Sequence, residues 1–328
     1  IVPYIKYTER GVSILSIIQT KKLTKRYGAK NSVCNISLTA NEGEIYGFLG
    51  LNGAGKTTTM RMLLKMIRST SGEIYYSGQS ISKLPAEFWN QVGYLIETPH
   101  AYPNFTVAEN LILYAKQRLI PASEIKQRVD NILQQLLLDP YRQVKVKDLS
   151  LGNNQKIGLA KALIHRPKIL LLDEPTNGLD PEGLVAVRHS LIEMAKNGTT
   201  VFISSHLLDE MEKIVDRIGI LAHGRLLREL NVSEFERERQ SRLYIKTDGS
   251  VKNLAGYLTT KRLPYQQLSE AELLVSGISM NQYAALLHQL EQEKLNPMIF
   301  HPVKESLEEF FLRIIKEGHH DETVMVND

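Results

Sequence analysis

A glycine-rich segment between a strand-like run and a helical run is the feature that most restricts the fold of this 328-residue chain. The strand-like run 44–49 precedes the segment, and apolar residues follow it at helical spacing from Met60 to Ile67. Glycines let backbone N–H groups turn toward an anion, and the positive end of the following helix dipole faces the same point. A strand, a glycine loop and a helix in this order predict an α/β domain that holds phosphate groups.

The segment fits the pattern G-x-x-x-x-G-K-[ST]. Lys56 is expected to reach the β- and γ-phosphates of a nucleotide, and the Thr57 hydroxyl is expected to bind Mg²⁺. The residues predicted to bind the nucleotide here are Gly50, Leu51, Asn52, Gly53, Ala54, Gly55, Lys56, Thr57 and Thr58.

Two carboxylates, Asp173 and Glu174, follow the continuous apolar run 169–172. Such a run is typical of a strand buried on both faces of a parallel sheet, and the carboxyl ends of these strands line the ligand crevice. Side chains alternate along a strand, so the two acids need not do the same work. One of them can hold Mg²⁺, directly or through water, while the other polarises the attacking water.

The chain divides into three parts by pattern. Residues 1–19 match no later pattern and are expected to be an N-terminal extension. Strands alternate with helices over 20–230, interrupted by a helical lobe over about 98–150, where Thr106 and Glu109 form a capping box. The remainder, 231–328, is expected to be an accessory α+β domain of βαββαβ order with a terminal helix, a ferredoxin-like arrangement. Within the first domain, the alternating run 36–39 predicts a strand.

Composition excludes several classes of protein. The sequence has no run of 18 apolar residues, so we expect no membrane-spanning segment. The single cysteine, Cys34, excludes an internal disulfide and fits a reducing compartment. A net charge of +4 from 40 basic and 36 acidic residues is too small to predict a nucleic-acid partner.

The segment 149–156, Leu-Ser-Leu-Gly-Asn-Asn-Gln-Lys, comes just before the acidic strand. Ser150 stands where it can cap the next helix, whose N-terminus then attracts an anion. The segment resembles the LSGGQ signature of the ATP-binding-cassette (ABC) ATPases, a group of P-loop NTPases, with Leu151 in place of a glycine and Asn153 in place of the glutamine. The resemblance implies that Ser150, Gly152 and Asn153 contact ATP.

Other residues resemble the same family in the same order. Asp180, after the acidic strand, resembles the aspartate that contacts the second subunit. His206, at the end of the next strand, resembles the switch histidine that contacts the γ-phosphate, and Tyr27 resembles the aromatic residue that stacks on adenine. Glu97 stands where most relatives have a glutamine; a carboxylate there can ligate Mg²⁺ but adds negative charge near the phosphates.

The runs 94–99 and 102–111 resemble bacitracin-resistance and lantibiotic-immunity exporters. The resemblance implies an ATP-hydrolysing subunit that forms a head-to-tail homodimer, with ATP and Mg²⁺ between Lys56 of one chain and Ser150 of the other. With it we expect Asp173 to hold Mg²⁺ and Glu174 to act as general base on the attacking water. It also implies separate integral membrane permease subunits and a peripheral place on the cytoplasmic face of the cell membrane. A soluble ABC ATPase acting on ribosomes or DNA, or a regulatory module without turnover, stays an alternative at this point.

Overall fold

The structure is a computed structural model that describes residues 6–7, 13–14, 16–97 and 99–325. Its contacts divide the chain into a first unit, Ile1–Val232, and a second unit, Ser233–Asp328. This division lies two residues after the boundary that we expected from the sequence. No helix among the described residues combines the length and the apolar character that a membrane crossing requires.

A six-stranded sheet forms the centre of the first unit, in the order β13-β12-β6-β11-β10-β9. All neighbours are parallel except β13, which runs antiparallel to β12. Every residue of β6, β10 and β11 is buried, as expected for strands covered on both faces. The strands are β6 (Ile45–Gly50), β9 (Val92–Leu95), β10 (Ile169–Asp173), β11 (Thr200–Ser205), β12 (Arg217–Ala222) and β13 (Arg225–Asn231).

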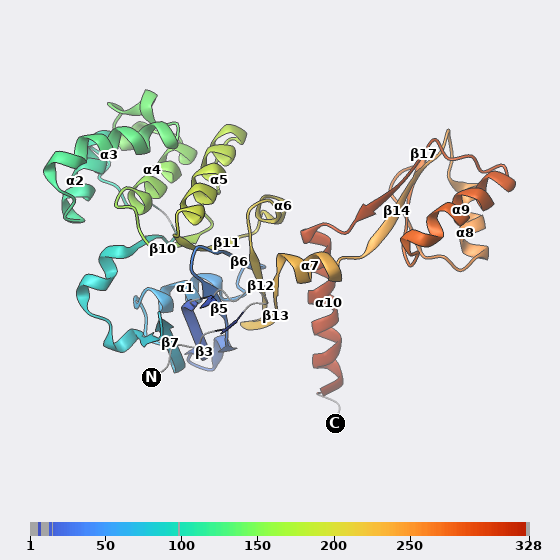
Figure 1. The fold of residues 1–328 in the computed structure, drawn as a ribbon, viewed down its shortest axis with the longest axis horizontal. Coiled ribbons are helices and arrows are strands. Elements are labelled where there is room, and N and C mark those ends of the chain that lie inside the picture. The colour runs from blue at the N-terminus through green and yellow to red at the C-terminus, as the bar shows by residue number, and fades with distance from the viewer. Residues whose placement is uncertain (1–5, 8–12, 15, 98, 326–328) are drawn as a thin grey trace. The chain divides into compact units, whose positions relative to one another are not determined.

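Helices surround this sheet, and α2 and α3 lie within the range 98–150 where we expected a helical lobe. Figure 1 shows α2, α3 and α4 gathered at one end of the first unit, beside α5. Between α3 and α4 lie two 3₁₀ turns, Asp139–Tyr141 and Val146–Asp148. Residue 98, where we expected the lobe to begin, is outside the described residues. The helices are α1 (Lys56–Leu63), α2 (Val107–Gln117), α3 (Ala122–Gln135), α4 (Leu151–Leu163), α5 (Pro181–Lys196) and α6 (Leu208–Glu212).

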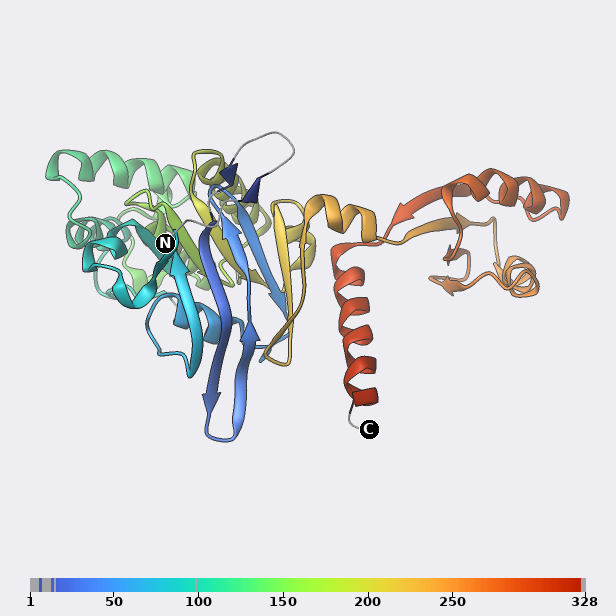
Figure 2. The same ribbon diagram turned by 60° about the horizontal axis from the view of Figure 1, so that its bottom comes forward.

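A second, antiparallel sheet is built around β3 (Ser16–Tyr27), which forms a long hairpin with β4 (Lys30–Ile36), coloured blue in Figure 2. β3 also pairs with β5 (Thr39–Asn41) and β7 (Ser71–Tyr76), and β7 pairs with β8 (Gln79–Ser80). The assignment of 16–19 to an N-terminal extension was therefore wrong: Ile18 is fully buried in the core of the unit. Ahead of it, β1 (Lys6–Tyr7) pairs with β2 (Ser13–Ile14).

The strand predicted over 36–39 is broken in the structure, because β4 ends at Ile36 and β5 begins at Thr39. The buried hydroxyl of Thr20 explains the break. It donates to the Ile36 carbonyl at 3.0 Å and accepts from the Leu38 amide at 3.1 Å, so it takes up backbone groups that a continuous strand would pair.

The second unit contains a four-stranded antiparallel sheet in the order β15-β16-β14-β17. Its core joins α8 and α9 to β14 and β16, which is the split βαβ arrangement that the sequence predicts. The charged run 234–239 forms most of α7 rather than a fully solvated segment, because Phe235 is buried and its ring lies 5.1 Å from that of Phe310. The elements are α7 (Val232–Glu238), β14 (Ser241–Lys246), α8 (Lys252–Thr260), β15 (Tyr265–Gln267), β16 (Glu272–Val275), α9 (Met280–Gln292), β17 (Ile299–Lys304) and α10 (Leu307–Met325).

Candidate functional site

The glycine loop joins the carboxyl end of β6 to the N-terminus of α1. Gly55, the residue before α1, has a φ of 107°, and a Cβ there would lie 2.5 Å from the Ser32 carbonyl oxygen. A side chain is therefore excluded both by backbone conformation and by space. The loop and the start of α1 line a cavity of about 200 Å³ whose walls include Asn52, Gly53 and Thr58. The cavity receives the positive end of the α1 dipole, which favours an anion.

Lys56 is buried at the floor of this cavity. Its ammonium group donates to the Gly50 carbonyl at 2.6 Å and to the Leu51 carbonyl at 3.4 Å, and lies 3.6 Å from Glu174 Oε1. These contacts hold a positive charge inside a loop of inward-facing backbone groups. The arrangement suits a phosphate, whose oxygens can accept from the ammonium and from the loop amides.

Thr57 and Asp173 meet at the edge of the same cavity. The Thr57 hydroxyl donates to Asp173 Oδ2 at 2.6 Å, and the buried Ser204 hydroxyl donates to Asp173 Oδ1 at 2.5 Å. A hydroxyl and a fixed carboxylate beside a phosphate site form a hard oxygen donor set of the kind that Mg²⁺ takes together with phosphate oxygens and water. Among the described residues no group of three or more His, Cys, Asp or Glu side chains is placed to hold a metal by itself.

Glu174 and His206 form a hydrogen-bonded pair next to Lys56. His206 Nδ1 lies 2.7 Å from Glu174 Oε2, and the His206 amide donates to the same oxygen at 3.2 Å. The other oxygen, Oε1, is buried and hydrogen-bonds to no residue that the structure describes. Glu174 has a φ of 50°, a left-handed conformation that a non-glycine residue rarely adopts and that is frequent at functional sites. The carboxylate thus has one anchored oxygen and one that faces the Lys56 ammonium and is available to a water.

The signature-like segment forms a different surface from the glycine loop. Ser150 caps α4 by accepting from the Asn153 amide at 3.2 Å. A Cβ at Gly152 would lie 2.4 Å from the Gly178 carbonyl oxygen, so this position is closely packed against the loop after β10. A depression of about 510 Å³ is lined by Ser150, Gly152, Asn153 and Asp180, and shares none of its described lining residues with the glycine-loop cavity.

Asp180 lies at the N-terminus of α5, where its carboxylate accepts from the Gly183 amide at 3.1 Å. The buried Lys156 ammonium lies 3.5 Å from the same oxygen. The Gly183 N–H bond, followed by the charge of Lys156, lowers the pKa of Asp180. Asp180 is thus held as an anion on the same surface as Ser150.

Two predicted residues stand apart from these contacts. Tyr27 is half exposed at the end of β3, with the Lys25 ammonium 5.0 Å from its ring centre, and adenine stacking by Tyr27 stays a prediction. Glu97 makes an ion pair with Arg61 of α1, and its role as a metal ligand likewise stays a prediction.

Sequence reasoning missed four residues that support the site. Ser32 contacts the Thr58 hydroxyl at 3.1 Å, and Ser204 bonds both Asp173 and the Glu174 amide. Gln155 of α4 donates to the Glu174 carbonyl at 3.1 Å. The fourth residue is Arg61 of α1, which pairs with Glu97 and which the helical pattern of the sequence does not distinguish from its neighbours. Only Ser204 had a usable signal, since it ends a buried strand next to the acidic one.

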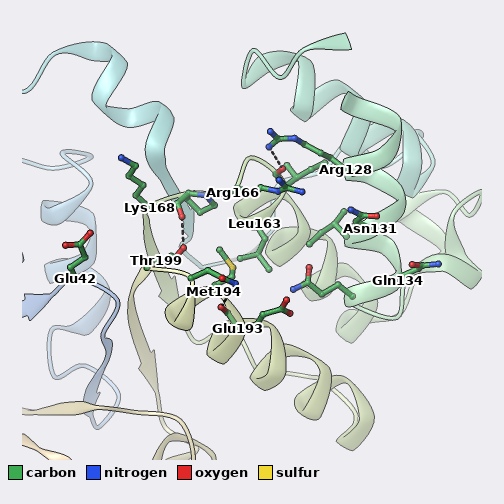
Figure 3. Close-up of a pocket in the computed structure, with 16 residues that line it drawn as sticks. Glu42, Arg128, Asn131, Gln134, Leu163, Arg166, Lys168, Glu193, Met194 and Thr199 are labelled. Atoms are coloured by element: carbon green, nitrogen blue, oxygen red, sulfur yellow. Dashed lines mark hydrogen bonds between the residues drawn. The ribbon is translucent and has the colours of Figure 1, made fainter. Parts of the chain in front are cut away.

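A cavity of about 990 Å³ lies at the other edge of the sheet, before the first residues of β10 and β11 (Figure 3). Lys168 and Thr199 line it from these strand starts, and Arg128, Leu163 and Glu193 line it from the surrounding helices. It contains none of the predicted site residues. Size alone therefore does not identify the functional site of this chain.

Comparison with known proteins places this geometry in a family. Residues 33–177 match the family model described as ABC transporter. The bacitracin transport ATP-binding protein BcrA of Bacillus licheniformis is 37% identical over 313 residues, which cover 92% of this chain and 98% of that protein. The protein of the same name from Enterococcus faecalis is 41% identical over 237 residues, 72% of this chain and 76% of that protein.

Solved structures agree with these relatives. The structure described as the ATP binding subunit of an ABC transporter has a TM-score of 0.63 at 27% identity, covering 68% of this chain and 93% of that one. A dimeric bacterial ABC transporter cassette has a TM-score of 0.61 at 25% identity, covering 66% of this chain and 99% of that one. The chain therefore belongs to the ABC transporter family, as one of its ATP-hydrolysing, ATP-binding subunits.

Proposed function

We propose that two copies of this chain close around two ATP molecules and that hydrolysis drives a separate membrane permease. The observation that carries this proposal is the separation of the two nucleotide-binding surfaces. Lys56 and Thr57 line one cavity, whereas Ser150 and Gly152 line another. A second copy in head-to-tail orientation can bring its Ser150 surface to the first copy's Lys56 cavity, and the solved relative described as a dimeric cassette supports such an assembly.

ATP binding rearranges the contacts that Lys56 makes in this structure. The ammonium exchanges the Gly50 and Leu51 carbonyls for phosphate oxygens, while the loop amides donate to the same phosphates. Thr57 and Asp173 would hold Mg²⁺, which supplies positive charge to the β- and γ-phosphates. Ser204 keeps the Asp173 carboxylate oriented for this task.

Glu174 is the general base in the proposed hydrolysis. Its free oxygen accepts a proton from a water while the water oxygen forms a bond to the γ-phosphorus. The bond between the γ-phosphorus and the bridging oxygen breaks, which yields ADP and inorganic phosphate. His206 holds the other carboxylate oxygen by two contacts, so the base keeps its direction as the water reacts.

The permease is proposed to dock on a groove of about 480 Å³ that lies between the core sheet and the helical lobe. Met66 and Tyr94 line it as half-exposed apolar side chains, and Tyr114 and Arg118 line it from α2 and its end. Tyr94 lies three residues before Glu97, so movement in the permease can reach the nucleotide site through a short segment. An amphipathic helix with an acidic residue for Arg118 fits these walls.

The cargo is proposed to be a peptide antibiotic of the bacitracin class, exported from the cytoplasmic face of the membrane. Support comes from the two relatives named as bacitracin transport proteins, one of which matches this chain over almost its full length. We assign ATP hydrolysis to this chain and the cargo path to the permease.

Coexpression with the permease pair tests this function. Cells that express this chain together with the permease should survive higher bacitracin concentrations than cells that express the permease alone. Glu174→Gln should abolish the protection and lower ATP turnover by about 10²–10⁴-fold, the usual contribution of a positioned general base. Normal turnover in this variant would contradict the assigned base, and unchanged sensitivity with the wild-type chain would contradict the assigned cargo.

A further inference from the structure

We propose that Arg61 is a positioning residue that holds the Glu97 carboxylate until Mg–ATP binds, so that Arg61 and Mg²⁺ compete for Glu97. The inference rests on the proposed ATP site. It assigns a role to an arginine that no motif marks, and it explains how the chain accommodates a carboxylate at this place.

The register of the sheet places Glu97 and Arg61 near Thr57 and Asp173, the proposed Mg²⁺ ligands. Leu95 pairs with Leu172, so the backbone that follows β9 runs beside the end of β10, where Asp173 binds Thr57. Arg61 follows Thr57 by four residues on α1, which places both side chains on one face of that helix. Its guanidinium Nη2 donates to Glu97 Oε1.

The backbone of Glu97 is in a conformation that needs support. Its φ of 60° lies in the left-handed region, which is unfavourable for a residue with a side chain. The Arg61 contact is a restraint that keeps the segment in this form, and loss of the contact allows Glu97 to relax to an ordinary conformation. In our proposal the Glu97 carboxylate is on Arg61 before metal binds and is released from it afterwards.

The strength of the ion pair fits a contact that opens and closes. The Arg61 side chain is 37% exposed and that of Glu97 is 56% exposed, so water screens both charges. Exposed pairs of this kind change an equilibrium by at most about fivefold, the equivalent of roughly 1 kcal/mol. A divalent ion next to Asp173 offers Glu97 a stronger partner than one exposed guanidinium.

Charge balance gives the pair a second effect, which acts on nucleotide bound without metal and opposes the first. An unpaired carboxylate near the phosphates repels ATP, and Arg61 neutralises that carboxylate while no metal is bound. When Mg²⁺ arrives, it takes over this neutralisation and Arg61 is released.

The test is a magnesium titration of the binding of a fluorescent ATP analogue to the full chain. Arg61→Gln should lower the Mg²⁺ concentration for half-saturation by about three- to fivefold, because Glu97 is freed in advance. Arg61→Lys, which keeps the charge but loses the planar donor group, should give a smaller shift in the same direction. Arg68→Gln is the matched control, since it removes an equal charge from the exposed segment after α1.

The Glu97→Gln background separates competition from general electrostatics. There, Arg61→Gln should shift the half-saturation no more than Arg68→Gln does. The titration follows binding of the analogue, so it needs no turnover.

Equal magnesium shifts in the wild-type and Glu97→Gln backgrounds, or a higher magnesium requirement in Arg61→Gln, would overturn the competition. This failure is distinguishable from failure of the proposed function, because the wild-type chain would still bind and hydrolyse ATP. A wild-type chain that binds no ATP would overturn both.

Discussion

Gly152→Ala tests whether ATP turnover depends on the close packing of Gly152, at the start of α4, against the loop after β10. The new Cβ would lie 2.4 Å from the Gly178 carbonyl oxygen, about 1 Å closer than ordinary van der Waals contact. Backbone atoms cannot rotate away, so the start of α4 must move relative to the loop that carries Asp180. Overpacking of this kind costs about 1–3 kcal/mol of folding stability, and a displacement of about 1 Å in a catalytic arrangement can cost about 10²-fold in rate.

The assay compares three quantities in one variant. Gly152→Ala should retain ATP binding to the isolated chain, because the Lys56 cavity shares no described residue with the depression that Gly152 lines, yet its ATP turnover should fall by about 10²-fold. Urea unfolding should show the loss of stability. Gly256→Ala, a helical glycine with nothing within 4 Å of the added Cβ, is the matched control and should stabilise by about 1 kcal/mol. Wild-type turnover in Gly152→Ala would refute the reasoning.

Three other sets of substitutions test the geometry. Lys56→Ala should weaken ATP binding by about 10- to 100-fold, the effect of losing one charged hydrogen-bond donor. Unchanged affinity in a fluorescence titration would contradict the assignment of the Lys56 cavity as the phosphate site. Gly55→Ala should cost about 2–5 kcal/mol in urea unfolding, whereas Gly53→Ala, which has a φ of 78° but nothing within 4 Å, should cost only about 1–2 kcal/mol; equal costs would contradict the clash. Burial, and then the Arg118 charge, lower the pKa of His165 from 6.5 to about 4. Between these two pH values the unfolded chain binds a proton at His165 that the folded chain does not bind. The free energy of unfolding should therefore be highest above pH 6.5 and fall by about 2 kcal/mol as the pH is lowered toward 4, after allowance for partial exposure. His165→Asn should show less of this loss, and an unchanged pH slope would contradict the assignment.

Patterns within short stretches of sequence were enough to predict the elements that form the proposed phosphate site. The all-buried strands β6 and β10 are visible as continuous apolar runs, and the capping box of Thr106 and Glu109 starts α2 where the sequence predicts. The glycine loop is equally predictable, because the conformation and space at Gly55 admit no side chain.

Contacts between distant segments could not be predicted in the same way. The buried Thr20 hydroxyl breaks the strand expected over 36–39, and nothing near residue 36 indicates that partner. We assigned Ile18 to an N-terminal extension because nothing in the sequence around it indicates that its strand pairs with β5 and β7.

The candidate site shows the same division between local and distant information. Its residue types and their order were predicted, but their partners were not. Gln155 reaches the Glu174 backbone from 19 residues away, and Arg61 reaches Glu97 from 36 residues away. Neither pairing leaves a periodic signal. The Gln155 contact depends on how α4 packs near the end of β10, and the Arg61 contact depends on the register of β9 and β10, rather than on spacing along the chain.

Sedimentation of Glu174→Gln, with and without Mg–ATP, tests the central claim most directly. Glu174→Gln blocks hydrolysis with a side chain of nearly the same size and leaves the other residues of both nucleotide surfaces unchanged, so the closed pair should accumulate. We predict a monomer without nucleotide and a dimer with it, and the dimer should vanish when Lys56→Ala is added. A variant that binds ATP yet sediments as a monomer at every concentration would contradict the assembly of one site from two chains.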